Sequence, residues 1–95
     1  MSTFFSQVLH EALDQYDPND PAQGLLAVRT AGQTYYGLVT RVSPTGSGFT
    51  LICHDREGRP APYPVHIATD TVRAMRFADL LDAPDDNYHK TNGPV

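Results

Sequence analysis

The chain has 95 residues, a formal net charge of −4 and 40% hydrophobic residues. This length excludes a large enzyme with a deep cleft, and the composition is that of a globular chain rather than a disordered one. Its single cysteine excludes an internal disulfide and a cysteine-based zinc site, and no apolar run reaches the roughly 18–20 residues of a membrane span. We therefore expect a soluble cytoplasmic protein with no membrane partner and no cofactor.

Residues 4–16 predict an amphipathic helix. Their apolar side chains recur at the three-to-four spacing of one helix face: Phe4, Phe5, Val8, Leu9, Ala12, Leu13 and Tyr16. Asp17 and Pro18 end the helix, because proline disfavours a helical conformation in the residue before it. Residues 17–24 are rich in turn-forming residues and predict a linker.

The middle of the chain predicts five short strands. Runs rich in β-branched and aromatic residues are separated by turn signals and cover residues 25–30, 34–42, 49–54, 61–67 and 71–77. This pattern is typical of a small β barrel or sandwich, so we expect a mainly β fold with a leading helix. Residues 78–83 could add one helical turn, which makes 1–83 a single domain, and 84–95 predict a flexible acidic tail.

Two of the predicted strands carry unusual residues. Gly37 lies inside the second strand, where glycine usually marks a bend, a bulge or a close approach of two backbones. We expect the second strand to bend there. In the fourth strand Pro60, Pro62 and Pro64 alternate, so the three missing N–H groups would fall along one edge. That run is either a blunted edge strand or a polyproline-like loop.

The helix, the five strands and the glycine-bent second strand together resemble the Sm-like barrel, the family of bacterial Hfq and the eukaryotic Sm and LSm proteins. Residues 32–39 are similar to its first motif, a glycine, four residues, a second glycine and an apolar run. Residues 65–67 and 71–75 look like its last two strands around a tight turn. Ser43 stands where the family usually has Asp.

The resemblance implies a ring that binds single-stranded RNA. Such rings close by pairing the fourth strand of one subunit with the fifth strand of the next, and the alternating prolines could obstruct that pairing. An SH3-like barrel would fit the same strand pattern and would differ in its connectivity.

The basic charge is confined to the middle of the chain. Residues 1–22 carry a net −4, residues 23–77 carry +3 with six arginines, and residues 78–95 carry −3. Arginine suits bidentate contacts with phosphate or carboxylate groups. The division is either incidental to a solvated surface or marks an anionic ligand on the barrel, with acidic ends that compete for the same surface.

The candidate nucleic-acid-binding residues combine aromatic rings, on which bases stack, with cations that hold phosphates. By the period-two alternation of a strand, Tyr35 and Arg41 share one face, and Tyr36 faces the other side and the core. The resemblance adds Tyr63 and His66 to the candidate residues, because they are similar to a Tyr-Lys-His run of Hfq, with different spacing and no lysine. The predicted site is therefore Tyr35, Arg41, Tyr63, His66 and Arg73.

Catalysis has little support in the residues. Cys53 and His54 are adjacent in a strand and point to opposite faces, so they do not form a nucleophile and base, and Cys53 is expected in the core. The histidines lack metal-ligand spacing, and we expect neither an enzyme nor a metal site. Two hypotheses remain: an oligomeric RNA-binding Sm-like protein, or a small adaptor of phage or mobile-element origin that docks a protein partner through its helix.

Overall fold

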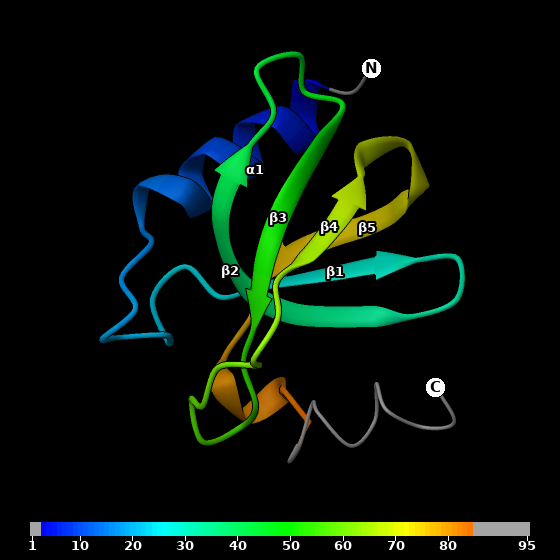
Figure 1. Ribbon diagram of the computed structural model, residues 1–95. Coiled ribbons are helices and arrows are strands. Elements are labelled where there is room, and N and C mark those ends of the chain that lie inside the picture. Colours follow the sequence, from blue (N-terminus) through cyan, green and yellow to red (C-terminus); the bar gives the residue numbers. More distant parts are fainter. Residues whose placement is uncertain (1–2, 85–95) are drawn as a thin grey trace.

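The computed structural model describes residues 3–84, which form one N-terminal helix and a single sheet of five antiparallel strands (Figure 1). The predicted mainly β fold with a leading helix is confirmed, while all of the predicted tail (84–95) except Pro84 lies outside the described residues. The elements are α1 (Thr3–Asp14), β1 (Leu26–Thr30), β2 (Thr34–Val42), β3 (Gly48–Cys53), β4 (Val65–Ala68), β5 (Val72–Phe77) and the 3-10 turns η1 (Thr69–Thr71) and η2 (Leu80–Asp82).

The strands lie in the order β4-β3-β2-β1-β5 across the sheet. Consecutive strands pair from β1 to β4, and the η1 turn then carries the chain across to β5, which pairs with β1. The sheet is open: within residues 3–84, β4 and β5 each have one edge without a strand partner. No helix in this part of the chain has the length and apolar character needed to cross a bilayer.

β2 bends at Gly37, as predicted. The first half of β2 pairs with β1 as far as the Leu26–Gly37 pair, and the second half pairs with β3 from the Gly37–Cys53 pair onward. A Cβ atom at Gly37 would lie 2.6 Å from the Ile52 carbonyl oxygen and 2.9 Å from the Cys53 Cα. Only glycine therefore allows β2 to curve closely over β3 and serve both halves of the sheet (Figure 1).

The core lies between α1 and the concave side of the sheet. Leu9 and Ala12 of α1 are each 1% exposed and pack with buried strand residues that include Val28, Val39 and Leu51. Removing a leucine side chain from water stabilises the fold by about 1.5–3 kcal/mol. The apolar stripe of the helix is thus used within the molecule, which leaves Tyr16 exposed at its end.

The prediction of a fourth strand over 61–67 is wrong in its first half. β4 begins at Val65, and residues 60–64 form a loop that is joined to the residue just after β3 by an isolated bridge of Pro60 with His54. Proline fixes φ near −65°, far from the roughly −140° of an antiparallel strand, and the chain bends at Pro62 and Tyr63. The alternating prolines therefore lie outside the edge strand.

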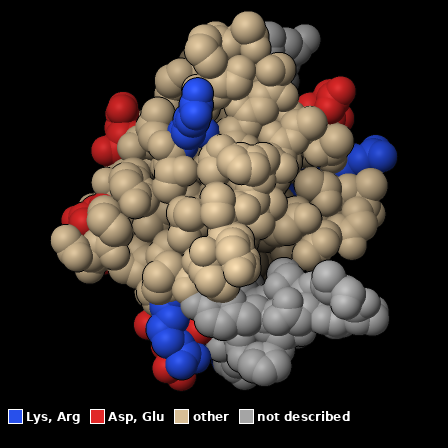
Figure 2. Space-filling model, in the orientation of Figure 1, with Lys and Arg blue, Asp and Glu red and all other residues tan. Residues whose placement is uncertain are grey.

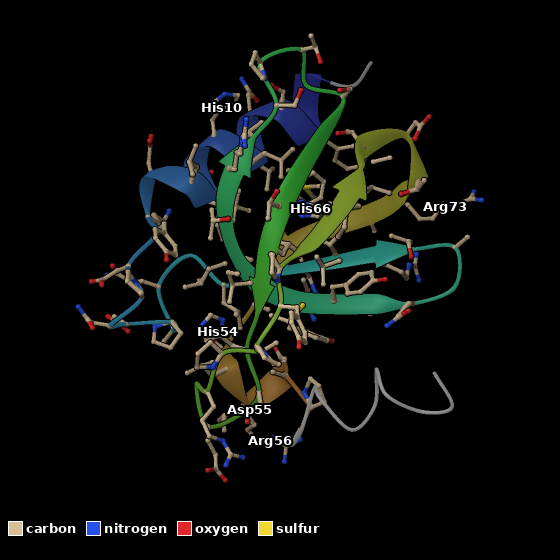
Figure 3. The ribbon with its side chains drawn as sticks, viewed as in Figure 1. His10, His54, Asp55, Arg56, His66 and Arg73 are labelled. Atoms are coloured by element: carbon tan, nitrogen blue, oxygen red, sulfur yellow. The ribbon has the colours of Figure 1, made fainter. Side chains whose placement is uncertain are left out.

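A buried carboxylate organises the loop between β3 and β4. Asp55 is 1% exposed and accepts hydrogen bonds from the backbone N–H groups of Glu57 and Arg59 and from Arg59 Nε at 2.8 Å. The same loop holds the end of the described chain, because Arg56 donates its backbone N–H to the Pro84 carbonyl oxygen and its Nε to the Ala83 carbonyl oxygen. Figure 3 shows Asp55 and Arg56 beside this segment.

Candidate nucleic-acid interface

A shallow groove of about 350 Å³ runs across the outer face of β2, β3 and β4, and we call it the β2–β4 groove. Arg41, Thr50 and His66 lie directly opposite one another on the three strands and form one row across it. The structure thus brings together two of the predicted site residues, Arg41 and His66.

The polar groups of this row are positioned for a ligand. Thr50 Oγ1 and His66 Nδ1 lie 2.9 Å apart, which fixes the imidazole ring and leaves Nε2 without a hydrogen-bond partner within residues 3–84. In the same part of the chain no carboxylate lies within ion-pair distance of Arg41, which is exposed. A cation and a ring nitrogen are therefore available at this surface to a phosphate or a base.

The prediction that Tyr35 and Arg41 share a face is wrong. The pairing of β2 with β3 shifts register between Val39 and Arg41, so one extra residue interrupts the alternation of side chains. Tyr35 is half-buried and packs against the core, and its hydroxyl hydrogen-bonds Gln33 Oε1 at 3.3 Å. Arg41 lies beyond the bulge and projects from the outer face.

The other two predicted residues lie apart from the β2–β4 groove. Tyr63 is 77% exposed in the loop before β4, and it does not line the groove. Arg73 is exposed on β5, at the opposite end of the strand order, and Figure 3 shows it pointing away from His66. The five predicted residues therefore do not form one continuous site.

A second outer groove, of about 320 Å³, lies over β1, β2 and β5, and we call it the β1–β5 groove. Tyr36, Ala27 and Arg76 form one row across these strands, and Thr34, Arg29 and Ala74 form the next. Tyr36, which we expected in the core, instead lines this groove and is half-buried. In the sequence these residues occupy alternate positions on three strands. That alternation identifies a common groove only when the order of the strands is known.

The two arginines of the β1–β5 groove differ in their surroundings. Arg29 has no carboxylate within ion-pair distance among residues 3–84, and Arg76 Nη1 lies 3.7 Å from Asp82 Oδ2, between two largely exposed side chains. On the face seen in Figure 2 the basic side chains lie at separate places around a broad uncharged centre, and those at the bottom of the view contact acidic side chains. That face therefore carries separate cations rather than one continuous basic patch.

The buried titratable residues lie at the end of β3. Burial raises the pKa of the Cys53 thiol to about 11, so this core thiol stays protonated at neutral pH. Burial also lowers the pKa of His54, although the Ile52 carbonyl and Asp55 act in the opposite direction. Burial alone would raise the pKa of Asp55, but the hydrogen bonds and charge of Arg59, with the Glu57 amide, outweigh it and hold that pKa below its usual range.

No family model, curated protein or solved structure matches this chain. Among residues 3–84, no group of three or more His, Cys, Asp and Glu side chains is arranged to hold a metal ion.

Proposed function

We propose that this chain is a non-enzymatic Sm-like protein that binds single-stranded RNA and assembles into a closed oligomer. In this proposal the sheet curves into an Sm-like barrel, and the two outer strands join neighbouring copies. The observation that carries the proposal is the position of the free edges. The resemblance implies pairing of the fourth strand with the fifth strand of another copy, and β4 and β5 are the strands with an unpartnered edge within residues 3–84.

The free edge of β4 has hydrogen-bond donors to offer. Thr69 donates its backbone N–H to the Ser47 carbonyl oxygen in the same register in which β4 pairs with β3. Alternate N–H groups of a strand point the same way, so those of His66 and Ala68 point away from β3. The prolines of the preceding loop do not remove these donors, because they lie before Val65.

The free edge of β5 is equally available. Ala78 donates its backbone N–H to the Leu25 carbonyl oxygen, in register with the pairing of β5 and β1. By the same alternation the N–H groups of Met75 and Phe77 point away from β1. Antiparallel association of β4 with β5 of a second copy would satisfy both edges.

RNA binding is proposed at the β2–β4 groove. Arg41 supplies a cation for a phosphate, and His66 and Thr50 supply polar groups on the adjacent strands. Tyr63 remains a predicted contact outside the groove, whereas Arg73 on β5 lies outside both grooves and is left out of the proposed contact surface. An oligomer would repeat the groove around its ring, so several weak contacts could act on one strand together.

The substitution Ala68→Pro tests the assembly. The φ angle of Ala68 is −76°, close to the value proline requires, so the change removes one outward donor without straining the backbone. We expect the wild type to be oligomeric and the variant to be a folded monomer in size-exclusion chromatography with light scattering. Ala68→Ser keeps the N–H group and should remain oligomeric. A wild-type monomer that ignores a short single-stranded RNA even at low salt would overturn the proposal.

The adaptor hypothesis has lost its main structural support. It needs the apolar stripe of α1 to be free for a partner, but Leu9 and Ala12 are buried against the sheet of the same molecule. These two residues of the stripe are therefore committed to the core, which removes the argument for docking through them.

A further inference from the structure

The β1–β5 groove has a floor of small side chains. Ala27 lies at the centre of one row and Ala74 at the end of the next, so neither fills the space above the strands. Tyr36 and Arg76 stand on the two strands that flank Ala27. Strands lie about 4.8 Å apart, so these two side chains rise about 9–10 Å from each other. A planar ring can lie over Ala27 between them.

Two arginines, Arg29 and Arg76, line the groove beside this floor. Arg29 lies on β1 directly opposite Ala74, and Arg76 is two residues further along β5 on the same face. Such diagonal neighbours have Cα atoms about 7–8 Å apart, within reach of one ligand for side chains as long as arginine. Arg29 has no carboxylate partner among the described residues, and the Asp82 contact of Arg76 is long and solvent-exposed.

We infer that the β1–β5 groove binds a nucleoside phosphate, with the base against Tyr36 over Ala27 and the phosphate between Arg29 and Arg76. Bases stack on tyrosine rings whatever their identity, and paired guanidinium groups hold phosphate oxygens through charge-assisted hydrogen bonds. The volume of about 320 Å³ lies at the lower end of the range of small-ligand sites. This site uses none of the residues of the β2–β4 groove, so it does not depend on the proposed function.

The ligand could be a free nucleotide or one unit of a nucleic-acid strand, and the experiment separates the two. Backbone amide shifts of the labelled protein are followed by NMR during titration with adenosine and uridine 5′-monophosphates, and separately with a short single-stranded RNA. Adenosine and inorganic phosphate are titrated as half-ligands. We expect shifts centred on Ala27, Arg29, Tyr36 and Arg76, with each half-ligand binding more weakly than the whole nucleotide. Shifts with RNA alone would identify a strand unit, and shifts with the monophosphates would identify a free nucleotide.

Two variants localise the ligand to the groove. Arg29→Gln removes one exposed cation and should weaken nucleotide binding about tenfold or more. Ala27→Leu fills the floor without changing any charge and should abolish binding. Arg73→Gln makes the same charge change on β5 outside both grooves, so it should leave nucleotide affinity within about twofold of the wild type.

Arg41→Ala separates this inference from the proposed function. It removes the cation of the β2–β4 groove, so the shifts at Ala27 and Tyr36 should persist in it even if RNA binding to the whole protein is lost. The inference is overturned if neither nucleotide nor RNA shifts the groove residues, or if Ala27→Leu binds as well as the wild type.

Discussion

At the scale of single residues, Gly37 is the position on which the curvature of the sheet depends. Its missing side chain lets the backbone of β2 pass within contact of the Ile52 carbonyl group on β3. The clash that a Cβ atom would cause is with backbone rather than with a flexible side chain, so relief would require the strands to separate. The pairing on both sides of β2 would then weaken.

Gly37→Ala should therefore destabilise the fold by about 2–3 kcal/mol, in the range of overpacking in a tight core. Urea denaturation followed by circular dichroism measures this change. Gly32→Ala is the matched control, because nothing lies within 4 Å of a Cβ atom at that position. The control should be neutral or slightly stabilising, and equal losses in both variants would contradict the close-approach explanation.

Asp55 is a second residue with a structural task, and it makes stability depend on pH. Its pKa is lower in the folded protein than in the unfolded chain, so the unfolded state takes up a proton first as the pH falls. The stabilisation is fully present above the ordinary Asp pKa of about 3.9 and is lost as the pH falls through the folded pKa.

Asp55→Asn should lower the free energy of unfolding at neutral pH by about 1–3 kcal/mol, chiefly through the weakened acceptor for the Glu57 and Arg59 backbone amides. The ion pair adds little, because the Arg59 side chain is 60% exposed and screened by water. Denaturation series between neutral pH and the acid range should show a steeper loss in the wild type than in the variant. Parallel curves would rule out this role for Asp55.

At the scale of the elements, α1 matters because it covers the core face of the sheet. Its buried residues Leu9 and Ala12 pack with strand residues, while Gln7 on the same helix is exposed. Helices of this length are marginal in isolation, so the stability of α1 comes from this packing.

Hydrogen exchange should accordingly show amides in the middle of α1 protected in the isolated protein. Leu9→Ala should destabilise the fold by about 2–5 kcal/mol and speed exchange in α1, whereas Gln7→Ala should change little. Rapid exchange throughout α1 in the wild type would return the helix to consideration as a docking element for a protein partner.

At the scale of the whole molecule, the arginines are concentrated in the middle of the chain, and four of the six lie on strands of the sheet. All six arginines lie within residues 23–77, although the chain as a whole is acidic. An anionic strand would therefore be attracted to the sheet locally and repelled by the ends, which makes ionic strength a sensitive variable.

RNA affinity should fall as salt rises, because binding releases counterions condensed on the strand. In plots of log affinity against log salt concentration, Arg41→Ala should reduce the slope by about one phosphate contact, roughly 0.7 for a single strand. Arg73→Ala provides a charge-matched comparison. Equal changes in both variants would indicate a general field effect rather than contact at the β2–β4 groove.

Elements whose causes are local could be predicted from the residues alone. The spacing of Leu9 and Ala12 placed a helix with one apolar face, and β-branched runs placed five strands, four of them within about two residues of their observed ends. Gly37 predicted the bend in β2, because glycine inside a strand usually marks a bend, a bulge or a close approach of two backbones. The prediction of a proline-blunted edge strand was wrong, because it assumed a strand over residues 61–67, whereas residues 60–64 form a loop.

Which side chains meet depends on pairing between distant segments, and no local pattern predicts it. One extra residue between Val39 and Arg41 turned Arg41 to the face opposite Tyr35, and no local signal marks such a bulge because it is set by pairing with β3. The β1–β5 groove likewise needs β5 beside β1, a contact between segments far apart in the chain. The alternation of side chains along each strand can be predicted from the sequence. Which strands are neighbours depends on the packing of the whole sheet around α1.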